Sequence, residues 1–229
     1  MTPAKREIFF AALAKAIPSP KSELEHSTPY ELLVAVILSA QATDKGVNVA
    51  TRKLFPVANT PQKITALGEE GLSEYIKTIG LYRGKAKNVI AMSRILLEKH
   101  GGQVPKTREA LEELPGVGRK TANVVLNISF GEPTIAVDTH VFRVSNRTGL
   151  APGKTPLEVE TRLLANTPRE YLKDAHHWLI LHGRYTCVAK RPLCEKCPVF
   201  EPCGFAEKRK YAGGGPLGDR IKKLAASEG

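Results

Sequence analysis

The chain has 229 residues, enough for one large domain or two smaller ones with separate hydrophobic cores. Its 34 lysines and arginines exceed its 23 aspartates and glutamates, and the net charge of +11 favours a polyanionic partner. No apolar run is long enough to span a membrane, and no secretory signal is evident, so we expect neither a membrane partner nor export.

The first forty residues predict two helices. Residues 4–17 place apolar side chains on one face, typical of a helix that docks on a core. Thr28-Pro29-Tyr30-Glu31 is a capping box with proline at the first helical position, and the apolar segment Leu32–Ala40 behind it predicts a helix buried on every side. The same Thr-Pro-x-Glu pattern recurs at Thr155 and Thr167.

Short helical patterns continue from Val47 to the glycine pair at 101–102. We expect one helix to end near Gly68, a second to take Gly80 as its C-cap, and a longer one to end at Gly101. No segment shows sustained alternation of apolar and polar residues between turn signals. The sequence therefore predicts an all-α protein with little or no sheet.

Two helical patterns meet at Leu114-Pro115-Gly116-Val117-Gly118-Arg119-Lys120-Thr121. Gly116 and Gly118 allow backbone angles and close approach that a Cβ would resist. The second helix, predicted from Thr121 to Phe130, starts with free backbone N–H groups and a positive dipole end, which together favour a phosphate. The glycine pattern alone leaves a helix-hairpin-helix DNA-binding motif and a plain αα-hairpin equally open.

Lys120 has two interpretations from the residues alone. It could bind a phosphate, or it could act as a nucleophilic amine, provided that the helix N-terminus, Arg119 and desolvation disfavour its ammonium form. Asp138, eighteen residues later, stands where the N-cap of the next helix would lie. Capping and chemistry could coexist at that carboxylate.

The C-terminal third combines a predicted helix ending at Gly183 with a local group of cysteines. The neighbouring histidines at 176, 177 and 182 are interpreted as packed rather than metal-binding. Residues 206–229 are predicted to be mostly disordered, with 212–229 as a tail.

Cys187-x6-Cys194-x2-Cys197-x5-Cys203 supplies four thiolates within one short segment. The spacing fits either a zinc site or an iron-sulfur cluster, and the single C-x2-C pair slightly favours the cluster.

Together, Lys120, the Val137-Asp138-Thr139-His140 segment and the four cysteines resemble the endonuclease III family, and the resemblance extends from about residue 5 to about residue 205. It implies an all-α, two-domain helix-hairpin-helix DNA glycosylase fold carrying a [4Fe-4S] cluster on the four cysteines. The expected domains are 22–132, containing the hairpin, and 1–21 joined to 133–211, bearing the cluster.

The resemblance also implies an activity: removal of oxidised pyrimidines from damaged double-stranded DNA, followed by AP lyase cleavage through β-elimination. Lys120 would form the Schiff base, and Asp138, across a cleft, would stabilise the developing positive charge. The protein would be a bacterial-type, cytoplasmic, nucleoid-associated monomer.

DNA contacts are expected at several further positions. Gln41 and Leu81 are candidates to fill the gap left by a flipped base, the alternatives being a helix-end polar group and a core residue. In the cluster loop, Lys190 and Arg191 are expected to meet phosphates. The hairpin residues Gly116, Val117, Gly118 and Arg119 are expected to do the same.

Two rival functions share some of these motifs. Relatives that remove adenine from mispairs generally lack the lysine at the position of Lys120 and add a large C-terminal domain, whereas this chain has Lys120 and ends 26 residues after Cys203. A DNA-binding module without catalysis, using hairpin and cluster only for structure, would have no activity to lose when Lys120 is replaced.

Overall fold

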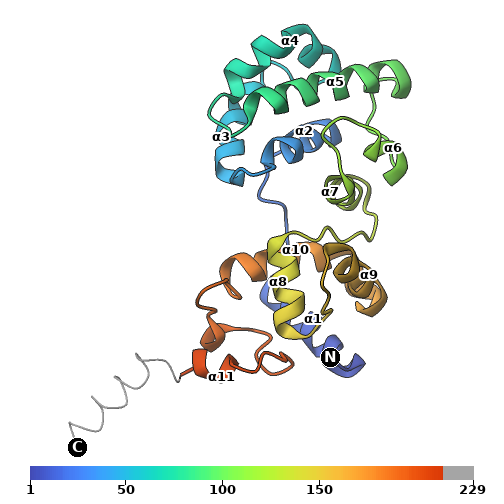
Figure 1. Ribbon diagram of the computed structural model, residues 1–229. Helices are drawn as coiled ribbons and strands as arrows, with labels where there is room; N and C mark the ends of the chain where they lie inside the picture. Colours follow the sequence, from blue (N-terminus) through green and yellow to red (C-terminus); the bar gives the residue numbers. More distant parts are fainter. Residues whose placement is uncertain (214–229) are drawn as a thin grey trace, which may run out of the picture. The chain divides into compact units, whose positions relative to one another are not determined.

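The computed structural model describes residues 1–213, and every regular element in that range is a helix (Figure 1). The predicted all-α fold is therefore confirmed. Most of the predicted tail, residues 214–229, lies outside the described residues. From residue 1 to residue 213, no helix combines the length and the apolar character needed to cross a membrane.

The chain forms two compact units. We call Ser22–Thr134 the hairpin unit, and Met1–Lys21 together with the chain from Ile135 onward the cysteine unit. The second crossing between units falls after Thr134, whereas the sequence placed it after residue 132.

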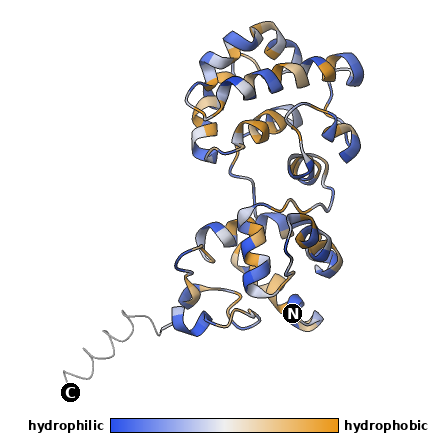
Figure 2. Cartoon of the chain, in the orientation of Figure 1, coloured by the Kyte–Doolittle hydropathy of each residue, from blue (hydrophilic) through white to orange (hydrophobic). Residues whose placement is uncertain are grey.

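The hairpin unit is a set of helices around α2 (Pro29–Ser39). Every residue of α2 from Tyr30 to Leu38 is buried, and Figure 2 colours most of this helix as hydrophobic. The predicted burial is therefore confirmed for Leu32–Leu38, whereas Ser39 is half-buried and Ala40 is exposed beyond the end of the helix. Figure 1 shows α4 and α5 packed side by side in the same unit. The other helices are α3 (Asp44–Leu54), α4 (Pro61–Ile76), α5 (Tyr82–His100), α6 (Arg108–Glu112) and α7 (Arg119–Phe130).

The capping box at the start of α2 forms with a small shift. The backbone N–H of Glu31 donates to Thr28 Oγ1 over 3.1 Å, as the pattern predicts. The Glu31 carboxylate, in turn, accepts from the backbone N–H of Ser27 over 2.6 Å. Two donors that precede the helical hydrogen-bond ladder are thereby satisfied, which fixes where this buried helix begins.

The cysteine unit has a core built from both ends of the chain. Phe9, Phe10 and Leu13 of α1 are fully buried in it, and the Trp178 indole donates to the carbonyl of Ile17 over 2.9 Å. The N-terminal helix therefore docks as predicted. The helices are α1 (Pro3–Ala16), α8 (Thr139–Thr148), α9 (Pro156–Asn166), α10 (Leu172–Tyr185) and α11 (Lys208–Tyr211), with 3-10 turns η1 (Arg169–Tyr171) and η2 (Cys194–Lys196).

Two predicted helix ends, at Gly80 and Gly183, are wrong. Gly80 is not a C-cap, because α4 already ends at Ile76 and the left-handed residue of the following turn is Leu81. Gly183 does not end α10, which continues to Tyr185. A Cβ on Gly183 would lie 2.9 Å from the Cβ of His140, so this glycine allows α10 to approach α8 closely.

Two other expectations are also corrected. Thr155 caps α9 by accepting from Glu158 N–H over 3.2 Å, whereas Thr167 follows the end of α9 and its buried hydroxyl has no hydrogen-bond partner in the described structure. Residues 208–211 form α11 instead of continuing as disordered chain.

Candidate active site and cysteine loop

The loop between α6 and α7 is a tight hairpin that depends on glycine. Gly116 has φ of +81°, and a Cβ at this position would lie 3.1 Å from the Cβ of Asn88 on α5. The Val117 N–H donates to the Leu114 carbonyl over 3.0 Å and closes the turn. Gly118 is the N-cap of α7 and offers no side-chain acceptor, so no N-cap side chain competes with an anion for the N-terminus of α7.

Lys120 is exposed in the first turn of α7. The helix begins at Arg119, two residues before the predicted start at Thr121, so Lys120 belongs to the helix itself. Its amine has no hydrogen bond or ion pair with any residue in the range 1–213. The amine is therefore available to an external group beside an open helix N-terminus.

Asp138 caps α8 with one oxygen only. Its Oδ1 atom accepts from His140 N–H over 2.9 Å and from Val141 N–H over 2.8 Å. These bonds hold the carboxylate rigidly while its Oδ2 atom takes part in neither. Capping and a second role are thus compatible in this geometry. Lys120 and Asp138 belong to different units, so the expectation that they face each other stays a prediction.

Gln41 and Leu81 share an unusual backbone. Within residues 1–213 they are the non-glycine residues with positive φ, at +53° and +59°. Such angles are costly for a side chain that bears a Cβ and tend to gather at functional sites. Leu81 is 67% exposed, which rules out the core position that was its alternative role.

The turns that carry these two residues lie together in the hairpin unit. A Cβ on Gly80 would lie 3.9 Å from the carbonyl oxygen of Gln41, so the two turns touch. Gln41 is also exposed, two residues beyond the end of α2. The structure thus presents an exposed polar side chain and an exposed apolar side chain at one place.

The four cysteines form a partly buried group in the cysteine unit. Burial raises the pKa of the Cys197 thiol to about 12, and nearby Cys203, Cys187 and Cys194 raise it further. Burial likewise raises the pKa of Cys194 and Cys203. Within residues 1–213 no group of three or more His, Cys, Asp or Glu side chains is arranged to hold a metal ion.

Several donors point at these sulfur atoms. Arg147 Nη1 lies 3.6 Å from Cys187 Sγ, and the Phe205 N–H donates to Cys203 Sγ over 3.4 Å. A backbone hydrogen bond from Val199 reaches Cys197. N–H groups directed at cysteine sulfurs stabilise thiolates and are a means by which proteins tune iron-sulfur clusters. The donor set therefore fits such a cluster.

Two arginines on α8, which the sequence motifs did not indicate, hold the first part of the cysteine loop. Arg147 donates to the carbonyls of Val188 and Ala189 over 2.7 and 2.8 Å. One turn earlier, Arg143 donates to the carbonyls of Cys187 and Gly183 over 3.1 and 2.7 Å. Their i, i+4 spacing on one face of α8 was the available signal.

Lys208 closes the last part of the loop. Its ammonium donates to the carbonyls of Phe200, Glu201 and Cys203 over 2.6, 3.2 and 2.7 Å. In the sequence this lysine was part of a basic run assigned to disordered chain. Lys190 and Arg191, predicted to meet phosphates, are exposed between the first two cysteines. Side-chain hydrogen bonds therefore hold the loop at both ends, and Lys190 and Arg191 are exposed to solvent.

Of the three histidines near the loop, two are buried, as interpreted from the sequence. His176 and His182 are each 2% exposed, and burial lowers the pKa of His182 to about 4, so its imidazole is neutral. Its Nε2 atom lies 3.9 Å from Cys197 Sγ, and its ring packs edge-on against Phe9.

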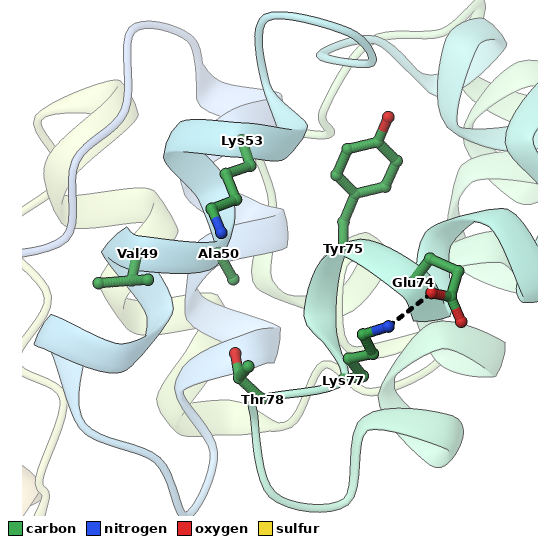
Figure 3. A pocket seen from close by; sticks show the side chains of 7 residues that line it. All are labelled: Val49, Ala50, Lys53, Glu74, Tyr75, Lys77 and Thr78. Atoms are coloured by element: carbon green, nitrogen blue, oxygen red, sulfur yellow. Dashed lines mark hydrogen bonds and ion pairs between the residues drawn. The ribbon is translucent and has the colours of Figure 1, made fainter.

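A cavity of about 310 Å³ lies elsewhere in the hairpin unit, between α3 and the C-terminal end of α4 (Figure 3). Its lining includes Ala50 and Tyr75, and the Lys77 ammonium pairs with Glu74 over 2.7 Å at its rim. None of the residues predicted for the site lines this cavity. It is a separate surface feature.

The sequence and the fold match known proteins of DNA repair. A family described as the HhH-GPD superfamily base excision DNA repair protein matches residues 34–169. Endonuclease III of Haemophilus influenzae is 59% identical over 211 residues, covering 92% of this chain and 100% of that protein. Endonuclease III of Escherichia coli K12 is 60% identical over 208 residues, covering 91% and 99%.

A solved structure of a trapped endonuclease III–DNA covalent intermediate is 45% identical, with a TM-score of 0.85, and covers 91% of this chain and 99% of that one. A non-covalent endonuclease III–DNA complex matches equally well in identity and TM-score.

The helical fold and the glycine hairpin thus define a helix-hairpin-helix protein of base excision DNA repair. Within that class the chain belongs to the endonuclease III family, the DNA N-glycosylases with AP lyase activity. The predicted family and activity are confirmed, and the rival binding module without catalysis is excluded.

Proposed function

We propose that the chain removes oxidised pyrimidines from duplex DNA and cleaves the resulting abasic strand through a Schiff base on Lys120. The observation that carries the proposal is the exposed, unpartnered amine of Lys120 in the first turn of the hairpin's second helix. An adjacent phosphate at the N-terminus of α7 would fix the sugar near this amine.

In the proposed reaction, the Lys120 amine forms a bond to C1′ as the bond from C1′ to the base breaks and the base leaves with the electron pair. Loss of a proton from nitrogen and opening of the sugar ring give the protonated Schiff base. Removal of a proton from C2′ then expels the 3′ phosphate by β-elimination, and water releases the enzyme. No step needs an oxidant or a reductant.

Asp138 is the group proposed to stabilise the positive charge that develops on the sugar during loss of the base. Its Oδ1 atom is committed to two backbone N–H groups of α8. Those bonds fix the orientation of the carboxylate. Its other oxygen could therefore interact with the sugar with little further loss of side-chain conformational entropy. The DNA substrate would bring this residue and Lys120 to the same nucleotide.

The cysteine loop is proposed to hold a [4Fe-4S] cluster on Cys187, Cys194, Cys197 and Cys203. A cation in contact with the sulfurs offsets the burial that disfavours their ionisation. When bound, the cluster supplies cross-links rather than chemistry. It fixes the loop so that Lys190 and Arg191 can meet phosphates.

Gln41 and Leu81 are proposed to enter the duplex where the damaged base leaves the stack. Their left-handed backbones and exposure hold both side chains outward on touching turns. We further propose that the partner is damaged double-stranded DNA, and that the protein acts as a monomer on the bacterial chromosome in the cytoplasm.

Borohydride trapping tests the proposal. The purified protein is mixed with a duplex that contains one abasic site, with a duplex that contains one oxidised pyrimidine, and with undamaged DNA. Covalent adducts on both damaged duplexes are expected. If folded, cluster-loaded protein binds the abasic duplex but gives no adduct, the lysine mechanism is wrong.

Replacing Asp138 by Asn should separate capping from chemistry. Asn caps helices as well as Asp does, so α8 should keep its stability. Without the negative charge, base release should slow by about a hundredfold. The measurements are the rate of base release under single-turnover conditions and the urea concentration at the midpoint of unfolding. A loss of stability with unchanged base release would assign Asp138 a structural role only.

A further inference from the structure

The N-terminal turn of α5 contains a buried lysine without a partner. Lys85 is 5% exposed, and its Nζ atom has no hydrogen-bond partner among residues 1–213. Burial alone lowers its pKa from the ordinary lysine value. A buried amine without a partner is costly, and buried polar groups are normally paired, so this lysine suggests a ligand.

The surrounding backbone is suited to an anion. The first intrahelical hydrogen bond of α5 runs from Lys85 N–H to the Leu81 carbonyl over 3.1 Å, so Tyr82, Arg83 and Gly84 precede the helical ladder. Leu81, the N-cap, provides no side-chain acceptor. Helical side chains lean toward the N-terminus of their helix, so we expect the Lys85 side chain to extend toward this same end.

Gly84 leaves the turn open. A Cβ at this position would meet no atom within 4 Å, and its φ is outside the region that favours glycine. Neither packing nor backbone angle therefore requires glycine here. A glycine in the first turn of a helix does allow a phosphate to approach the backbone closely.

Two DNA-facing features flank this turn. Leu81, proposed to enter the duplex, immediately precedes α5. Asn88, which lies one turn after Gly84 on the same face of the helix, packs under Gly116 of the hairpin. The turn therefore lies between the exposed leucine and the phosphate-binding loop, within a single unit.

We propose that the N-terminus of α5 is a second phosphate site, in which the Lys85 ammonium and the N–H groups of residues 82–84 bind a DNA phosphodiester beside the flipped nucleotide. This site rests on the proposed function, because it requires a distorted duplex on the hairpin unit. It also gives the buried amine of Lys85 a partner in the complex.

The test compares three variants that each lower the net charge of the protein by one unit. Lys85→Met removes the ammonium, and Gly84→Asp places a carboxylate at the anion site. Lys99→Met, at the exposed C-terminal turn of the same helix, is the matched control. The probe is a duplex with a tetrahydrofuran abasic analogue, which the enzyme cannot cleave. Fluorescence anisotropy gives its affinity at several salt concentrations.

Lys85→Met and Gly84→Asp should each weaken binding by about tenfold or more, whereas Lys99→Met should bind like the wild type. The slope of log Kobs against log salt concentration should become shallower by about one for Lys85→Met. The midpoints of urea denaturation should not fall in either variant. Removal of an unpaired buried amine and an acid at a helix N-terminus should each preserve or raise stability.

Wild-type affinity and salt slope in both variants would overturn the phosphate site, as would lost affinity accompanied by a lower urea midpoint. The proposed function has a separate readout in borohydride trapping by the wild type. Trapping together with unchanged binding by the variants would refute only the second phosphate site. Weakened binding by the variants without any wild-type trapping would refute only the lysine mechanism.

Discussion

Replacing Lys120 by Gln should abolish the borohydride adduct and slow strand cleavage at an abasic site by about a thousandfold or more. Glutamine has similar length and polarity but no amine, so it cannot form a Schiff base. The fold should be unaffected, because Lys120 is exposed and has no partner within residues 1–213. Single-turnover cleavage and trapping on the same duplex measure the effect.

Lys99→Gln is the matched control for this experiment, since it makes the same change on an exposed residue in the last turn of another helix, α5. It should trap and cleave like the wild type. DNA affinity of Lys120→Gln should fall only by the contribution of one charge. If Lys120→Gln still formed an adduct, another amine would be the nucleophile, and the role given to the hairpin lysine would be wrong.

The helix boundaries that could be predicted are those set by local chemistry. Thr28 caps α2 with its own hydroxyl, and Gly101 and Gly149 adopt the left-handed angles that end α5 and α8. The boundaries that could not be predicted depend on packing. Gly183 looks like a terminator, but in the fold it makes room for His140 of a neighbouring helix.

The candidate site shows the same division. The residues proposed to carry the chemistry could be predicted, because a lysine at a glycine hairpin and four closely spaced cysteines form recognisable sequence motifs. The side chains that hold the cysteine loop could not be predicted. Arg147 and Lys208 donate to backbone carbonyls, and because every residue has one, no residue type identifies the acceptor. Lys85 was invisible for a related reason: only burial distinguishes it from the other lysines.

The cysteine loop is held both by its own sulfurs and by side chains outside it. Arg143, Arg147 and Lys208 together donate to seven backbone carbonyls of the segment from Gly183 to Cys203. These bonds shape the loop, yet they leave the thiols in surroundings that raise the pKa values of three of them. A cation bound to the sulfurs would favour their ionised form and cross-link the loop.

Replacing Cys194 by Ala should therefore remove the visible absorption of the cluster and lower the free energy of unfolding by about 3 kcal/mol or more. DNA affinity should fall with it, because Lys190 and Arg191 would lose their fixed positions. Amide exchange should show lost protection across residues 187–203, with α5 of the hairpin unit unchanged. Glu195→Ala, at the exposed neighbouring position, is the control and should keep colour and stability. A soluble, colourless Cys194→Ala protein with undiminished activity would refute a structural cluster.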